Sequence, residues 1–142
     1  MHEEVKQKLP NKPSALIRIA LKDLELCEND GRYCVTMDEC WHEPTFNGKC
    51  NVCLAGSVMA QTLKMPITRL LFTEDLDEEE NKLIALDCFR QGDIDSGLTE
   101  LSMNISDYKI DSCRRIISYH DNPKLFKSQL LALADDLAKE GL

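Results

Sequence analysis

Long apolar runs and aromatic residues are both scarce in this sequence. No window approaches the roughly 18 consecutive apolar residues that a transmembrane helix needs, and only 6% of residues are aromatic. The first twelve residues are polar and charged, without the apolar stretch of a secretory signal. Glycine-rich phosphate loops, serine elbows and metalloprotease helix motifs are also missing. These absences predict a cytoplasmic chain and disfavour nucleotide hydrolysis and the common hydrolase mechanisms.

Basic side chains are in short supply. The chain has 17 Lys and Arg against 25 Asp and Glu, a formal net charge of -8. Because nucleic-acid phosphates attract basic surfaces, we expect no direct binding to DNA or RNA. A basic protein partner, or mimicry of nucleic acid toward a protein that binds it, fits this charge better, although many soluble proteins are acidic for no functional reason.

The seven cysteines do not resemble an extracellular disulfide framework. Their number is odd, and several lie on apolar stripes, which is typical of a reducing cytosol. Cys27, Cys88 and Cys113 are expected in the core, where a free cysteine behaves as a small hydrophobic residue.

Apolar periodicity predicts a mainly α fold. The length of 142 residues fits one domain, which we expect to be a flexible tail at 1–12 followed by a single helical domain at 13–142. Helical stripes run over 13–30, 53–64, 73–92, 95–103, 110–117 and 122–141. Residues 33–37 alternate like a short strand, and Asn47-Gly48 offers a turn that would return the chain antiparallel near 50–53. The prediction is therefore a compact multi-helix domain with one small β-hairpin in its N-terminal third.

Four potential soft metal ligands lie close together in the sequence: Cys40, His42, Cys50 and Cys53. Zinc takes four tetrahedral ligands from thiolates and imidazoles, and a two-residue gap lets two cysteines reach one ion. This pattern predicts one structural zinc ion, with Cys34 as a competing fourth ligand.

Three other interpretations of this segment stay open. The cysteines can simply be reduced thiols in a hairpin. Cys-x-x-Cys at a helix start is also the arrangement of thiol redox catalysts. Thirdly, Cys53 with His120 as its base would make a cysteine-dependent enzyme.

Two features suggest a surface for a protein partner. The acidic run at 74–80 is the densest in the chain, and Trp41 is of the type enriched at binding hot spots. The candidate partner-binding residues are Trp41, His42, Glu74, Asp75, Asp77 and Glu78. Both features also have a purely structural explanation. The acidic run can be a solvated helix start, where negative charge complements the helix dipole, and Trp41 can cover one end of the core. The same amphipathic stripes also suit a homo-oligomer.

The sequence resembles a group of small uncharacterised bacteriophage proteins. The resemblance rests on Trp41-His42-Glu43-Pro44, on 50–60 (Cys-x-Val-Cys-Leu-Ala-Gly-x-Val-Met-Ala) and on Leu133-Ala134-Asp135-Asp136-Leu137. It also takes in Asn81-Lys82-Leu83-x-Ala85-Leu86 and Phe89-Arg90-x-Gly92, and so covers most of the chain beyond the tail. It implies an accessory protein, made in the cytoplasm of an infected bacterium, that binds and modulates a host or phage protein without catalysis.

Overall fold

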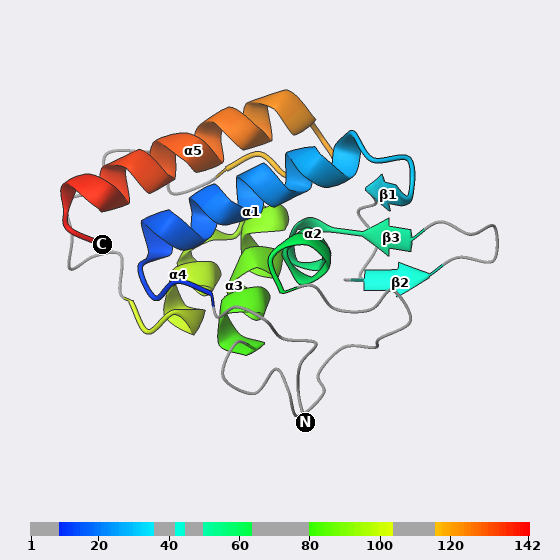
Figure 1. Ribbon diagram of the computed structural model, residues 1–142. Coiled ribbons are helices and arrows are strands. Elements are labelled where there is room, and N and C mark those ends of the chain that lie inside the picture. Colours follow the sequence, from blue (N-terminus) through cyan, green and yellow to red (C-terminus); the bar gives the residue numbers. More distant parts are fainter. Residues whose placement is uncertain (1–8, 36–41, 45–49, 64–79, 104–115) are drawn as a thin grey trace, which may run out of the picture. The chain divides into compact units, whose positions relative to one another are not determined.

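The computed structural model describes residues 9–35, 42–44, 50–63, 80–103 and 116–142. The chain divides into two compact units. Unit 1 comprises Met1–Leu9 and Ile19–Glu80, and unit 2 comprises Pro10–Arg18 and Asn81–Leu142. The described elements, in chain order, are α1 (Pro13–Glu28), β1 (Tyr33–Val35), β2 (His42–Pro44), β3 (Cys50–Val52), α2 (Leu54–Gln61), α3 (Glu80–Arg90), α4 (Ile94–Glu100) and α5 (Pro123–Lys139) (Figure 1). The mainly helical prediction is confirmed.

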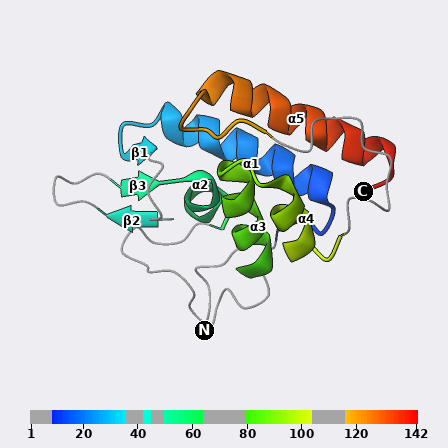
Figure 2. The same ribbon diagram turned by 180° about the vertical axis from the view of Figure 1, so that it is seen from behind.

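Unit 1 contains a small mixed sheet with strand order β1-β3-β2. The central strand β3 pairs parallel with β1, with Val35 beside Val52. It pairs antiparallel with β2, with His42 beside Val52 and Pro44 beside Cys50. Figure 2 shows β3 between the other two strands and continuing directly into α2.

The predicted antiparallel hairpin between 33–37 and 50–53 is wrong. Its two strands run parallel, and a parallel pair needs a crossover, which cannot be a two-residue turn. The chain between them supplies a third strand, β2. Nothing in the sequence indicated β2, because His42-Glu43-Pro44 is short, has no apolar alternation and ends in a residue without an N–H.

Apolar residues of α1, β3 and α2 form the described core of unit 1. Cys27, Val52 and Ala60 are buried together, and Tyr33 and Val35 of β1 pack against them. Cys27 is fully buried, as predicted, whereas Cys88, which was also expected in the core, is only partly buried. Helix α2 is mostly apolar and is buried on every side, with seven consecutive buried residues from Leu54 to Ala60. A helix of that composition must be surrounded by protein.

In unit 2, the start of α5 matches the sequence prediction. Asn122 caps α5, accepting a hydrogen bond from the Leu125 amide at 3.1 Å, and Pro123 follows in the first turn. Asp93 caps α4 by accepting from the Ser96 amide. The buried stripe of α5 matches the predicted one: Phe126, Leu130, Leu133, Ala134 and Leu137.

Three helices of unit 2 end in the same way, with a residue of positive φ just past the helix. These residues are Gly92 after α3 (φ 88°), Ser102 after α4 (φ 63°) and Gly141 after α5 (φ 80°). In each case the next amide bonds back to a carbonyl of the last turn: Asp93 to Cys88, Met103 to Leu98 and Leu142 to Leu137. This is the Schellman ending, which favours glycine because a Cβ is strained there.

Some predicted segments lie partly or wholly outside the described residues. The acidic start of the third helix at 73–79 is one of them, and α3 is described from Glu80. The predicted helix at 110–117 is another, although Ile116 and Ile117 themselves are not helical. Leu9, inside the segment predicted as a tail, is buried. Among the described helices, none is both long and apolar enough to cross a membrane.

Candidate functional site

The junction of β3 and α2 carries the Cys-x-x-Cys motif. Cys50 begins the strand, and Cys53 follows it in an extended conformation (φ -105°, ψ -163°) as the N-cap of α2. The Cys53 side chain makes no capping hydrogen bond. Its carbonyl accepts hydrogen bonds from both the amide and the hydroxyl of Ser57, each at 2.8 Å. Cys53 therefore stands at a helix N-terminus, as the sequence predicted.

The structure places three of the four predicted zinc ligands on or directly after strands β2 and β3. His42 pairs with Val52, the residue before Cys53, and Cys50 lies on the same central strand. Cys40 lies outside the described residues. Among the side chains that the structure describes, no three His, Cys, Asp or Glu residues gather in a way that could hold a metal ion.

The extended conformation of β3 limits every function that needs Cys50 and Cys53 to act together. A strand rises about 3.3 Å per residue, so their Cα atoms stand about 10 Å apart. A disulfide needs Cα atoms within about 7 Å, and two sulfurs on one zinc ion lie about 4 Å apart. A redox dithiol or a zinc pair therefore requires a turn at Asn51-Val52 in place of this strand pairing.

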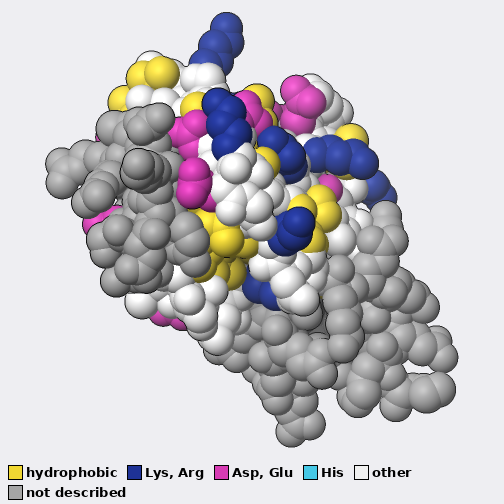
Figure 3. Space-filling view, turned by 90° about the vertical axis from the view of Figure 1, so that its left-hand side faces the viewer, with side chains coloured by type: hydrophobic (Ala, Val, Ile, Leu, Met, Phe, Trp, Pro, Cys, Tyr) yellow, Lys and Arg dark blue, Asp and Glu magenta, His cyan; other side chains and the backbone are white. Residues whose placement is uncertain are grey.

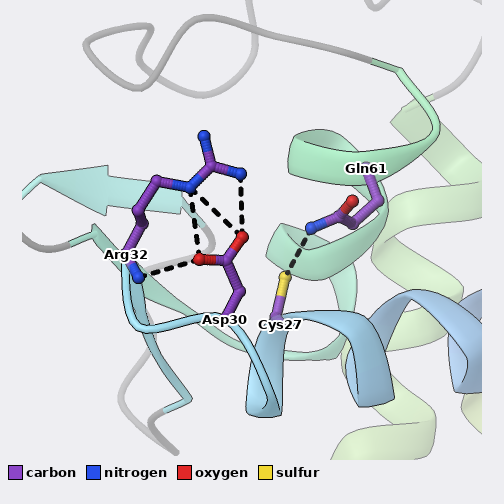
Figure 4. A network of polar contacts seen from close by, with 4 residues as sticks. All are labelled: Cys27, Asp30, Arg32 and Gln61. Atoms are coloured by element: carbon purple, nitrogen blue, oxygen red, sulfur yellow. Dashed lines mark hydrogen bonds and ion pairs between the residues drawn. The ribbon is translucent and has the colours of Figure 1, made fainter.

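A polar seam joins α1 to α2 inside unit 1. Gln61 donates a hydrogen bond from Nε2 to Sγ of Cys27 at 3.5 Å (Figure 4). One turn earlier on α1, the buried carboxylate of Asp23 accepts a hydrogen bond from the Thr62 hydroxyl at 2.5 Å. Burial raises the pKa of the Cys27 thiol, and hydrogen bonds from Gln61 and Ser57 oppose that rise.

This seam has the character of a structural contact and offers no reaction chemistry. A buried thiol with a raised pKa is a poor nucleophile, and the groups that hydrogen-bond to it are an amide and a hydroxyl. The sequence held one missed signal for it. Asp23 falls between Ala20 and Cys27 on the apolar stripe of α1, and a charged residue on such a stripe is expected to find a polar partner inside.

A second polar group lies where α1 leads into β1. Arg32 donates to the Asp30 carboxylate through Nη2 at 2.8 Å (Figure 4). The Arg32 guanidinium also lies over the Tyr33 ring, 5.6 Å from its centroid. Hydrogen bonds from Arg32 lower the pKa of Asp30. Arg32 is 71% exposed, so this pair orients the turn and contributes little to stability.

The two residues of the predicted cysteine enzyme belong to different units. Cys53 is in unit 1 and His120 in unit 2. The Cys53 side chain is fully buried, whereas His120 is exposed in the turn before α5. A cysteine nucleophile must contact its substrate. The buried Cys53 side chain is not accessible to a substrate.

Of the candidate partner-binding residues, Trp41, Glu74, Asp75, Asp77 and Glu78 lie outside the described residues, and His42 is described by its backbone alone. All six positions belong to the range of unit 1. That range holds seven basic and fifteen acidic residues, a net charge of -8, whereas unit 2 holds ten of each and is neutral. The whole net charge of the protein thus belongs to unit 1. Figure 3 shows a face on which acidic, basic and hydrophobic side chains are interspersed, with no patch of one sign among the described residues.

Comparisons with known proteins give no further assignment. No family model, no curated protein and no solved structure matches the chain.

Proposed function

We propose that this protein is a bacteriophage accessory protein that binds and modulates a host or phage protein, without catalysis, through an acidic surface of unit 1. The observation that carries the proposal is the division of charge. Unit 1 has eight more acidic than basic residues, and unit 2 has no excess of either sign. A charge of one sign held by one unit steers a partner of the opposite sign toward that unit. The partner surface is therefore basic.

The described residues of unit 1 also favour a basic partner. Glu25 is exposed near the end of α1, and the last turn of α1 holds no basic residue. The C-terminal end of a helix already carries a partial negative charge, so this carboxylate adds to it. A cationic partner surface would offset that repulsion on binding.

The test is affinity capture from a bacterial lysate, with four carboxylates of unit 1 neutralised in one variant. The first variant carries Glu74→Gln, Asp75→Asn, Asp77→Asn and Glu78→Gln. We expect the wild type to retain a partner at low ionic strength and to release it at high salt, because surface attraction is screened. The unit 1 variant should lose the partner under both conditions.

A matched variant in unit 2 controls for net charge. It carries Asp95→Asn, Glu100→Gln, Asp121→Asn and Glu140→Gln, which changes the charge by the same amount and should leave capture unchanged. If both variants lose the partner equally, or if both still capture it, the acidic residues of unit 1 do not bind the partner. If the partner is still captured at high salt but is no longer captured by Trp41→Ala, the binding surface lies at that tryptophan and not at the acidic residues.

A structural zinc ion in unit 1 is the second candidate. It is supported by the strand register, which sets His42 beside the residue that precedes Cys53. Binding by Cys50 and Cys53 together would require the end of β3 to bend into a turn. Metal analysis of protein purified without added zinc tests this: about one ion per chain supports it, and a content far below one ends it. Loss of the bound ion in Cys50→Ser, compared with Cys88→Ser in unit 2, would place the ligands.

A further inference from the structure

The outer face of α5 combines exposed leucines with charges of both signs. Leu125 is 40% exposed and Leu131 is 45% exposed, and these are two of the three large hydrophobic residues exposed in the described part of the chain. Lys124, Ser128 and Asp135 are exposed on the same helix. Positions 124, 128, 131 and 135 are spaced by four, three and four residues, which places them on one face of an α-helix.

The order of these residues makes the face complementary to itself. The midpoint between Lys124 and Asp135 is the same point of the helix as the midpoint between Ser128 and Leu131. If two copies of α5 lie antiparallel about a two-fold axis at that point, each Lys124 faces Asp135 of the other copy. Each Leu131 then lies over the small Ser128 of the other copy. Antiparallel helices also set their dipoles in opposite directions, which is favourable.

From this arrangement we infer that the protein forms a homodimer through the outer face of α5. The occupant of this face is a second copy of the chain, because an isologous interface requires a surface that complements itself. The charge supports the same choice. Unit 2 is neutral, so it offers no long-range attraction to a strongly basic or acidic partner, whereas the ordered charges of α5 suit another α5.

Asp135 already binds one cation within its own chain. Arg18 donates from Nη2 to Oδ1 at 2.8 Å, and the two side chains remain 47% and 55% exposed. The Asp135 carboxylate therefore keeps a solvent-facing side, and Lys124 of the second copy adds a further positive charge there. Arg18 orders the carboxylate before association, which lowers the entropy cost of the contact.

The dimer is weak and depends on concentration. Lys124 and Asp135 are eleven residues apart, or about 16 Å along the helix, and an interface of this length falls at the low end of the area of stable dimers. Sedimentation equilibrium from about 10 μM to about 1 mM, at low ionic strength, should show association in the upper part of this range. High salt should weaken it.

Charge reversal tests the geometry directly. In a homodimer, Lys124→Glu places the new carboxylate opposite Asp135 twice, and Asp135→Lys places the new ammonium group opposite Lys124 twice. Each variant alone should associate at least about tenfold more weakly than the wild type, because two attractive pairs become repulsive. An equimolar mixture of the two should associate again, because both pairs then join opposite charges.

Lys12→Glu is the matched control, since it makes the same charge change at an exposed position outside α5, and it should associate like the wild type. Far-UV circular dichroism checks that each variant stays folded. A wild type that is monomeric up to about 1 mM overturns the inference. So does association that survives Lys124→Glu, or a mixture of the two reversed variants that stays monomeric. None of these outcomes bears on partner binding by unit 1, so the two proposals fail separately.

Discussion

Alanine should be tolerated far less well at the glycine that ends α3 than at the glycine that ends α5, because the two have different surroundings. Gly92 and Gly141 both have φ near +80° to +90°. Alanine at either position takes on the left-handed strain of about 1–2 kcal/mol, offset by about 0.4–1 kcal/mol from the less flexible unfolded chain. Gly141→Ala should therefore destabilise unit 2 by about 1 kcal/mol, because a Cβ at Gly141 meets nothing within 4 Å.

Gly92→Ala carries the same strain and a collision in addition. Its Cβ would lie well inside 3.0 Å of the backbone oxygen of Ile116, a distance that real Cβ atoms do not reach. The segment at Ile116 cannot move away freely. The Ile117 amide donates to Oε1 of Gln129 at 2.8 Å, and the Tyr119 amide donates to the carbonyl of Arg90 at 3.3 Å.

The expected loss for Gly92→Ala is about 4–6 kcal/mol. The net left-handed strain costs about 1 kcal/mol, as at Gly141, overpacking adds about 1–3 kcal/mol, and each of the two hydrogen bonds that must stretch contributes about 1 kcal/mol. The assay is urea denaturation of both variants, with native-state hydrogen exchange at the amides of α3 and α5 to report on unit 2 alone. If the two variants lose equal stability, the close approach of Gly92 to Ile116 is refuted.

Gly97, Asn122 and Cys27 each make a contact whose loss or exposure can be measured. Gly97→Ala should cost about 1–2 kcal/mol in urea denaturation, since its Cβ would meet the buried Phe89 ring; unchanged stability would contradict that contact. Asn122→Ala should cost about 1 kcal/mol and increase hydrogen exchange in the first turn of α5. Because burial raises the pKa of the Cys27 thiol, less thiolate forms at a given pH. Peptide mass spectrometry after iodoacetamide treatment should therefore show Cys27 modified only once urea unfolds the chain.

Helices α1 and α5 could be predicted from the sequence because local signals determine them. The stripe and the Asn122-Pro123 start of α5 reproduce its observed bounds to within two residues. Helix α1 likewise begins at Pro13 and ends just before Asp30-Gly31. Caps and 3.6-residue periodicity act within one element, so the rest of the fold does not change them.

The sheet could not be predicted in the same way, because strand pairing is a property of distant segments. Tyr33–Val35 and Cys50–Val52 were recognised as extended, but whether they pair parallel or antiparallel depends on the intervening chain. The Asn47-Gly48 turn signal pointed to an antiparallel return to 33–37. The antiparallel partner of β3 is instead β2, which has no strand-like pattern.

The features of the candidate sites were likewise predictable where they depend on local sequence and not where they depend on the rest of the fold. The position of Cys53 at the start of α2 followed from the helical stripe that begins there. The complete burial of Cys53 did not, because it depends on how α2 is surrounded by protein. Residue counts alone could also not place the charge. The net value of -8 belongs entirely to unit 1, and the division of the chain that shows this joins Pro10–Arg18 to residues beyond Asn81.

The two proposals have a joint consequence, because a dimer through α5 carries two acidic units. A monovalent basic partner would bind each unit 1 with the same affinity, whether or not the protein is dimeric. A partner with several basic sites would bind the dimer more tightly, since the second contact becomes intramolecular. Lys124→Glu should therefore leave capture of a monovalent partner unchanged and weaken capture of an oligomeric one by at least about tenfold. Surface plasmon resonance with the partner immobilised at low and high density separates the cases. Weakening at both densities would mean that α5 itself contacts the partner.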